Sequence, residues 1–247
     1  MKTHSLIIGG TRGLGREVAR ILASRGGIVS VVGRHDPNPG DKSASSVSYW
    51  VCDVSKQADI DRTLSEIVKT AGKVNNVVFL QRFKGEGDKW HGEMDISLTA
   101  TKNVIESLEN YFSETRDNSI VIISSIADQF ISESQPVGYH VAKAGLCHLV
   151  RYYAVKLGKK GIRVNCVSPC TLVKEENKEF YSKNERLQGL FNTVIPLGRM
   201  GTSTDSAKVV AFLCSSEASF VTGQTITVDG GVSLLSQEAL ARQIAGI

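Results

Sequence analysis

Short apolar runs rich in valine and isoleucine alternate along the chain with longer segments in which apolar residues recur every three or four positions. The short runs predict β-strands, because continuous apolar stretches of four to eight residues are typical of strands buried on both faces. They lie at residues 5–10, 28–34, 47–55, 76–81, 118–125, 162–169 and 224–231. The longer segments predict helices and lie at residues 14–26, 59–72, 98–112 and 136–161.

This order of elements predicts an α/β fold. Strands that alternate with helices form a parallel sheet, and right-handed crossovers place helices on both of its faces. We therefore expect a Rossmann-like, doubly wound parallel sheet of about seven strands. One domain should span residues 1–247, since the sequence has no internal repeat and its Pro/Gly/Ser-rich stretch, residues 35–45, joins two strands within the unit.

Composition and charge exclude several function classes. The 247 residues are 41% hydrophobic and 22% charged, which is ordinary for a globular protein, and the net charge is +4. The densest basic run, residues 156–163, has no interleaved aromatic residues, so no nucleic-acid partner is expected. The apolar run near the N-terminus is too short for a signal peptide, and no stretch approaches 18 uninterrupted apolar residues. We expect a soluble, cytoplasmic protein with no membrane partner.

The five cysteines, at positions 52, 147, 166, 170 and 214, include no C-x-x-C pair. The spacing of Cys166 and Cys170 suits neither a zinc knuckle nor a redox pair. All five are expected to be reduced and mainly structural, and no metal site is predicted.

A glycine-rich turn, "GGTRGLG" at residues 9–15, lies where the first strand meets the first helix. Gly9, Gly13 and Gly15 let the backbone turn tightly and let a pyrophosphate approach the helix N-terminus, where free N–H groups and the helix dipole favour an anion. Its position between strand and helix is the context that a dinucleotide site requires.

The end of the second strand, "VVGRHD", distinguishes the two nicotinamide dinucleotides. An acidic residue there holds the ribose 2′-hydroxyl of NAD, whereas an arginine accommodates the 2′-phosphate of NADP. Arg34 follows the strand directly, and Arg12 of the glycine turn reaches the same place, so both guanidiniums are expected to bind that phosphate. Asp36 is the competing observation. NADP(H) is favoured over NAD(H).

The segment "YHVAK" places Tyr139 and Lys143 one helical turn apart. A free phenol is a weak acid, and an ammonium one turn away favours the phenolate, which makes the phenol a better proton donor. Ser125 ends a predicted strand fourteen residues earlier, at the sheet edge where ligands bind in open α/β folds. We expect Ser125 to hold a substrate oxygen against Tyr139, and the phenol to transfer a proton to it.

Together these motifs resemble the short-chain dehydrogenase/reductase family, in its single-domain form of about 250 residues. The resemblance covers essentially the whole chain. "GGTRGLG" is similar to the family's T-G-x-x-x-G-x-G, with Ile8 in place of the threonine, and "CDVS", "ISS", "YHVAK" and "IRVNCVSP" are similar to later motifs. "PLGRMGT" and "FLCSSEASFVTGQTITVDGG" are similar to the family's C-terminal third.

The resemblance implies a role for each matching residue. Ser125, Tyr139 and Lys143 are the expected catalytic residues, Lys143 also holds the nicotinamide ribose, Asp53 contacts the adenine, and the segment around Leu172 meets the carboxamide. The full set of expected cofactor-binding residues is Gly9, Thr11, Arg12, Gly13, Leu14, Gly15, Arg34, Asp53, Val54, Phe79, Leu80, Tyr139, Lys143 and Leu172.

Three departures from the family pattern bear on this assignment. Residues 79–82 read "FLQR" where the family usually has Asn-Asn-Ala-Gly, although backbone contacts from Phe79 to Gln81 survive such a change. Ser97 aligns with the asparagine that usually completes a catalytic tetrad; it retains a hydroxyl but lacks the reach of an amide. Cys170 replaces the glycine after the sixth strand, which is costly if that turn needs positive φ, and a reactive thiol there is an alternative.

Segments outside these motifs are expected to shape the substrate pocket and the assembly. In the family, a region like residues 173–198 is a mobile lid, and the charged loop 82–93 is expected to form another pocket wall. Arg82 and Lys84 either meet an acidic or sugar-like substrate or face solvent. The tail, residues 232–247, has an amphipathic pattern suited to capping a neighbouring subunit. Relatives commonly form tetramers through helices like 93–112 and 137–159, so a homo-oligomer, dimer or tetramer, is expected.

The sequence therefore predicts an NADP(H)-preferring oxidoreductase that transfers hydride between the cofactor and a small carbonyl or alcohol substrate. Two alternatives stay open: a catalytically inactive NADP(H)-binding sensor or scaffold, and a nucleotide-sugar epimerase or dehydratase that uses the same triad. No motif identifies the substrate.

Overall fold

The computed structural model describes residues 2–37, 46–115 and 117–247, so most of the loop expected at 35–45 lies outside the described residues. Seven strands form one parallel sheet in the order β3-β2-β1-β4-β5-β6-β9, which confirms the predicted doubly wound architecture. The strands are β1 (His4–Ile8), β2 (Ile28–Gly33), β3 (Val47–Val51), β4 (Asn76–Phe79), β5 (Asn118–Ile123), β6 (Ile162–Pro169) and β9 (Thr225–Val228).

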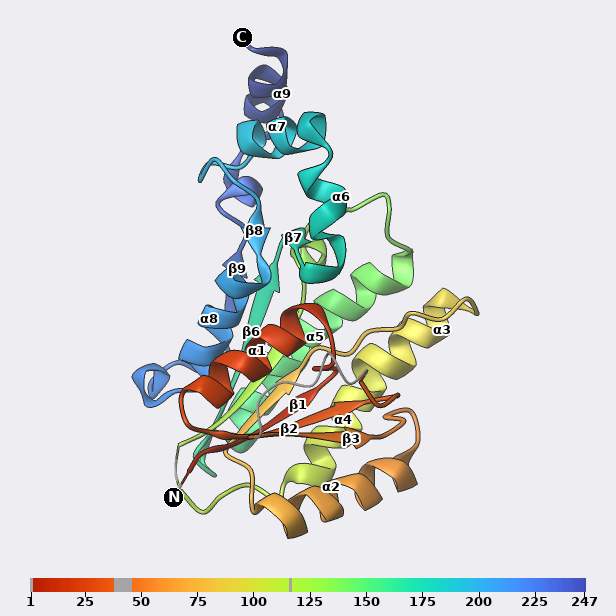
Figure 1. The fold of residues 1–247 in the computed structure, drawn as a ribbon, viewed down its shortest axis with the longest axis vertical. Coiled ribbons are helices and arrows are strands. Elements are labelled where there is room, and N and C mark those ends of the chain that lie inside the picture. The colour runs from red at the N-terminus through yellow and green to blue at the C-terminus, as the bar shows by residue number, and fades with distance from the viewer. Residues whose placement is uncertain (1, 38–45, 116) are drawn as a thin grey trace.

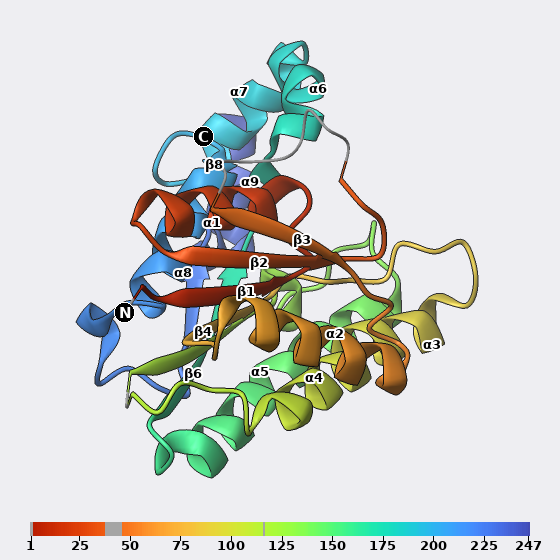
Figure 2. The same cartoon turned by 60° about the horizontal axis from the view of Figure 1, so that its bottom comes forward.

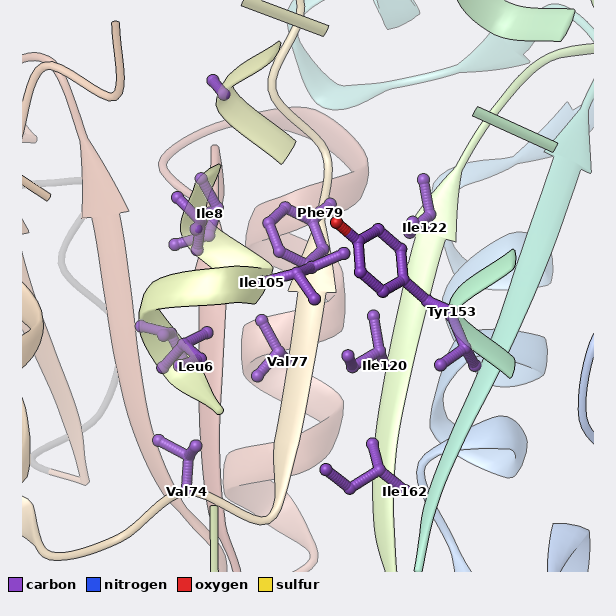
Figure 3. Close-up of a cluster of buried hydrophobic side chains, with 14 of the residues drawn as sticks. Leu6, Ile8, Val74, Val77, Phe79, Ile105, Ile120, Ile122, Tyr153 and Ile162 are labelled. Carbon is purple, nitrogen blue, oxygen red and sulfur yellow. The ribbon is translucent and has the colours of Figure 1, made fainter. Parts of the chain in front are cut away.

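Helices cover both faces of this sheet (Figures 1 and 2). On one face lie α1 (Gly13–Ser24) and α8 (Ser203–Leu213), and on the other lie α2 (Gln57–Ala71), α4 (Ala100–Leu108) and α5 (Val137–Gly158). The strands are mainly apolar because their side chains alternate between two buried layers. In β1, Leu6 and Ile8 pack on the layer of α4 and α5 (Figure 3). Ile7, between them, packs on the layer of α1.

The helix expected at 98–112 begins earlier than its sequence pattern indicates. Asp88 ends the loop after β4, and its carboxylate accepts hydrogen bonds from the backbone N–H groups of Trp90 (2.8 Å) and His91 (3.2 Å). This N-cap starts α3 (Lys89–Glu93), which continues through a π-helical stretch, Met94–Thr99, into α4. The last five residues of the expected loop 82–93 are therefore helical.

The segment after β6 and the C-terminal tail gather at one end of the molecule (Figure 1). A short strand, β7 (Leu172–Val173), pairs with β8 (Gly201–Thr202) apart from the main sheet. Between them lie a 3₁₀ turn (Glu175–Asn177), α6 (Lys178–Ser182) and α7 (Glu185–Val194). The tail forms α9 (Gln237–Ala245), which contacts α7 of its own chain.

Three further 3₁₀ turns, Ile126–Asp128, Ser216–Ala218 and Val232–Leu234, follow β5, α8 and β9. Across the described ranges, no helix has the length and apolar content needed to cross a bilayer. All five cysteines are free, and all except Cys170 are buried.

Candidate active site

A cavity of about 790 Å³ opens beyond the carboxyl ends of the parallel strands. Its walls come from the segments that follow β1, β2, β4, β5 and β6. The strand order reverses between β1 and β4, and open α/β sheets bind ligands at such a switch point. The fold therefore places one large cavity where the sequence motifs predict chemistry.

The glycine turn forms the floor of this cavity at the N-terminus of α1. Gly9 has a φ of +85°, and a Cβ added there would lie 2.7 Å from the backbone nitrogen of Gln81. A Cβ on Gly15 would lie 2.7 Å from the carbonyl oxygen of Gly9. Only glycine fits these positions, because the turn packs backbone against backbone.

A carboxylate from the segment after β7 already occupies the anion position of this turn. Glu176 Oε1 accepts a hydrogen bond from the Gly13 backbone N–H at 2.8 Å and from Arg16 Nη2 at 3.1 Å. Arg16 is buried and also donates to Glu175 at 2.8 Å. A helix N-terminus with a free N–H and a guanidinium beside it binds anions, so the turn suits a pyrophosphate.

Two arginines extend this basic character along the cavity wall. Arg12 and Arg34 both line the cavity and are both exposed, as are His35 and Asp36 beyond the end of β2. The residues present thus fit a dinucleotide: a glycine cradle, an anion-binding N-terminus, the Arg12 guanidinium in the glycine turn and the Arg34 guanidinium after the second strand.

Tyr139 and Lys143 lie in the first two turns of α5 and both face the cavity. The Lys143 Nζ lies 5.6 Å from the centroid of the Tyr139 ring. Lys143 is only 4% exposed, and its Nζ donates a hydrogen bond to the carbonyl oxygen of Ile123 at 2.8 Å. The ammonium is thereby fixed between the end of β5 and the phenol.

Burial lowers the pKa of Lys143 to about 8 from its ordinary value of 10.5, because desolvation disfavours the ammonium. Lys143 is therefore protonated at neutral pH and loses its charge just above it. This proximity of its pKa to physiological pH suits a group that supports proton transfer.

Ser125 lies directly after β5 and lines the cavity beside Tyr139. Its Oγ accepts a hydrogen bond from the Ala127 backbone N–H at 3.3 Å, which leaves the hydroxyl hydrogen available to a substrate oxygen. The neighbouring Ser124 points the other way and donates to the carbonyl oxygen of Lys143 at 2.9 Å. Ser124 thus joins the end of β5 to α5, and Ser125 caps the 3₁₀ turn Ile126–Asp128.

The "FLQR" segment places a cation and an amide at the cavity. The Arg82 guanidinium carbon lies 5.0 Å from the Tyr139 ring centroid, within the range of a cation–π contact. Gln81 Nε2 donates to Thr101 Oγ1 at 2.7 Å and to the carbonyl oxygen of Ile96 at 3.4 Å. Both Arg82 and Lys84 line the cavity and are exposed.

Most of the residues predicted for the site lie together around this cavity. They are Gly9, Thr11, Arg12, Gly13, Leu14, Gly15, Arg34, Val54, Leu80, Ser125, Tyr139, Lys143 and Leu172.

Three predicted site residues do not reach the cavity with their side chains. Phe79 packs in the core beside Ile105 and Tyr153 (Figure 3). The Asp53 carboxylate accepts hydrogen bonds from the Ser55 backbone N–H (3.1 Å) and hydroxyl (2.7 Å). These bonds lower the pKa of Asp53. Any contact that Phe79 or Asp53 makes with a cofactor stays a prediction.

Ser97 is the third of these residues. It is fully buried, and its Oγ donates to Glu93 Oε2 at 2.7 Å, a partner that the sequence pattern does not indicate.

Cys170 lines the cavity, but its chemistry does not favour the reactive-thiol alternative. Burial raises the pKa of Cys170 to about 11, so the nucleophilic thiolate is scarce at neutral pH. Among the described residues, every positive φ belongs to a glycine, so the turn at Cys170 does not need the glycine that the family usually has.

Comparisons with known proteins agree with this geometry. A family model described as enoyl-(acyl carrier protein) reductase matches residues 9–233. A 3-oxoacyl-(acyl-carrier-protein) reductase from Chlamydia muridarum is 31% identical over 248 residues, covering 93% of this chain and 96% of the relative. The human dehydrogenase/reductase SDR family member 4 is 30% identical over 241 residues, covering 92% of this chain and 86% of the relative.

Solved structures show the same fold at lower identity. The aldohexose dehydrogenase of Thermoplasma acidophilum superposes with a TM-score of 0.84 at 24% identity, over 96% of each chain. ElxO with NADP bound superposes with a TM-score of 0.83 at 23% identity, over 95% of this chain and 100% of the other.

Proposed function

The chain belongs to the short-chain dehydrogenase/reductase family of oxidoreductases, and from this premise we propose that it transfers hydride between NADP(H) and a carbonyl or alcohol substrate. One observation carries the proposal. Ser125, Tyr139 and Lys143 line the same cavity as the glycine turn, at the carboxyl edge of the sheet. A proton donor, an oxygen-orienting hydroxyl and a buried ammonium therefore share the space that a dinucleotide and a substrate would enter.

Ser125, Tyr139 and Lys143 each have a separate role in the proposed reduction. When bound, the dinucleotide supplies the hydride. Ser125 orients the substrate oxygen by a hydrogen bond, and the Tyr139 phenol donates a proton to that oxygen. Lys143 favours the phenolate electrostatically as the proton leaves, because its ammonium is held on the cavity side of α5 by the Ile123 carbonyl. Oxidation of an alcohol reverses each of these steps.

Basic residues support the preference for NADP(H). Arg12 and Arg34 line the cavity and would supply the positive charge that a 2′-phosphate requires, whereas Asp36, which lines the cavity too, is the competing carboxylate. Among the solved structures with this fold, ElxO has NADP bound. These observations favour NADP(H) over NAD(H).

The substitution Tyr139→Phe tests the mechanism. It removes the donor oxygen and keeps the ring, so we expect the rate of NADPH-dependent carbonyl reduction to fall by about 10² to 10⁴. The dissociation constant for NADPH, measured by fluorescence, should change little. Tyr152→Phe, which alters an exposed tyrosine on the same helix, is the matched control and should retain full activity. A Tyr139→Phe variant with wild-type turnover on the same carbonyl panel contradicts the mechanism.

A further inference from the structure

Glu93 is a buried carboxylate that the mechanism above does not use. It is 2% exposed and ends α3, and Ser97 lies one turn later in the π-helical stretch. The Ser97 hydroxyl donates to Glu93 Oε2 at 2.7 Å. A buried carboxylate is costly unless hydrogen bonds and an opposite charge stabilise it, so this side chain requires a reason beyond packing.

Two glycines of α5 show where the helix that carries Glu93 and Ser97 packs against α5. A Cβ added to Gly138 would lie 3.0 Å from Trp90 Cα, and a Cβ added to Gly145 would lie 3.0 Å from the side chain of Leu98. The helix that carries Glu93 and Ser97 therefore packs directly against α5 on both sides of Lys143. Because Lys143 lies between Gly138 and Gly145, the buried carboxylate and the buried ammonium lie on facing segments.

Side chains from elsewhere hold the π-helical stretch in this position. Gln81 donates to the Ile96 carbonyl oxygen at 3.4 Å and to Thr101 Oγ1 at 2.7 Å. Thr101 in turn donates to the Ser97 carbonyl oxygen at 2.6 Å. π-Helical turns are often found at functional sites, and here one is supported by the residue that departs from the family's "NNAG" segment. Gln81, Ser97 and Glu93 thus form one connected arrangement.

The other ionisable groups that act on Lys143 are two thiols and a guanidinium. Contact with Cys147, together with burial, holds the pKa of the Cys166 thiol well above its usual range, so Cys166 is neutral. Contact with Cys166 lowers the pKa of Cys147, whose Sγ donates to Asp128 Oδ2 at 2.9 Å. Arg82 is a cation and opposes the ammonium. Glu93 is a carboxylate, and its charge raises the pKa of Lys143.

We propose that Glu93, held in place by Ser97, is the counter-charge that keeps buried Lys143 in its ammonium form. Glu93 is a positioning residue that acts through Lys143 and does not touch the substrate. This inference rests on the proposed function, because the reduction requires a charged Lys143 beside the phenol. It also assigns a role to Ser97, which aligns with the asparagine of the family's catalytic tetrad.

The substitution Glu93→Gln tests the inference, since it removes the charge and keeps an oxygen for Ser97. Activity that depends on the ammonium is present below the pKa of Lys143, about 8, and is lost as pH rises through it. Without the carboxylate this pKa falls, so the alkaline limb of the kcat–pH profile should move to lower pH by about 1 unit or more. Asp95→Asn removes an exposed charge from the same stretch and should leave the limb unmoved.

A second measurement is independent of turnover. The side-chain NMR resonance of Lys143, assigned by its loss in Lys143→Met, is titrated in the cofactor-free protein. Its midpoint should fall in Glu93→Gln and stay close to the wild-type value in Glu93→Asp, which keeps the charge. Circular dichroism verifies that each variant is folded, and Glu93→Asp with Asp95→Asn provides the comparison if Glu93→Gln does not fold.

The outcomes separate the two proposals. An unchanged Lys143 midpoint in Glu93→Gln overturns the counter-charge role while leaving wild-type turnover, and so the proposed function, intact. A wild-type protein that reduces no carbonyl overturns the proposed function, yet the NMR titration still measures whether Glu93 sets the charge of Lys143.

Discussion

At the residue scale, we expect the choice between NADP(H) and NAD(H) to depend on two arginine side chains that line the cavity. Arg12 leaves the glycine turn and Arg34 follows β2, and both line the cavity. A guanidinium binds a phosphate by parallel hydrogen bonds that a ribose hydroxyl does not offer, so the pair favours the phosphorylated dinucleotide. Asp36 lies two residues after Arg34, where its carboxylate would repel that phosphate at longer range.

Replacing Arg34 by alanine should therefore weaken NADPH binding and affect NADH binding much less. Loss of one charge-assisted hydrogen-bond partner, worth about 1.5–3 kcal/mol, corresponds to a rise of about 10- to 150-fold in the NADPH dissociation constant. Titration of both cofactors by fluorescence measures the two changes. Arg20→Ala, an exposed arginine on α1 that pairs with Glu17, is the control. Equal losses of affinity for NADPH and NADH would indicate that Arg34 contacts a part of the cofactor that the two dinucleotides share.

At the scale of elements, the segment after β7 contacts the glycine turn directly. The 3₁₀ turn Glu175–Asn177 brings Glu176 to the Gly13 N–H and both glutamates to Arg16. A bound pyrophosphate would need the same N–H, so the two anions compete for one position. We therefore expect a bound cofactor to displace this segment, which belongs to the expected lid at residues 173–198, and α9 of the tail contacts α7 of the same region.

Glu176→Gln should bind NADPH more tightly than the wild type. The amide leaves the turn more readily than a carboxylate and does not repel the pyrophosphate, so we expect the dissociation constant to fall by about 3- to 10-fold. Arg16 keeps Glu175 as its partner, and the fold should be preserved. Glu179→Gln changes a lid carboxylate that pairs with Lys183 and serves as the control in the same titration. Weaker binding in Glu176→Gln would instead show that the contact helps to close the site.

At the scale of the whole molecule, α5 carries Tyr139 and Lys143, the proposed catalytic pair, on one side and exposed apolar residues on the other. Val137, Val141, Tyr152 and Val155 are exposed hydrophobic residues of this helix, and Val155 is 83% exposed. Their spacing places them along one face, which the described part of the chain leaves exposed. Exposed apolar faces mark association surfaces, and the family is typically oligomeric, so we propose that a second copy covers this face.

Val155→Asp should then shift the protein toward the monomer, whose mass is 26.7 kDa, because the substitution places a charge in an apolar contact. Size-exclusion chromatography with light scattering at micromolar concentration measures the change. Val51→Asp introduces the same charge at another exposed valine, at the end of the edge strand β3, and should leave the mass unchanged. A monomeric wild type, or an unchanged Val155→Asp oligomer, contradicts this assignment of the interface.

The sequence by itself determined the sheet, the glycine turn and the positions of Ser125, Tyr139 and Lys143. These features are local, because seven apolar runs specify the strands, and a spacing of four residues specifies which side chains share a helix face. Strand ends of a parallel sheet meet at one edge, so the topology rule alone brings Ser125 near Tyr139.

Only the tertiary structure decided the contacts that tune the site. Gly13 and Glu176 are 163 positions apart, and no periodic pattern relates the glycine turn to that lid carboxylate. The helix expected at 98–112 begins at Lys89, and Glu93 and Ser97, which lie before or outside the expected apolar pattern, are both buried. The Asp53 carboxylate and the Phe79 ring likewise found partners in the turn and the core. Backbone motifs are encoded by local spacing, whereas burial and the choice of hydrogen-bond partner depend on which distant segments pack together.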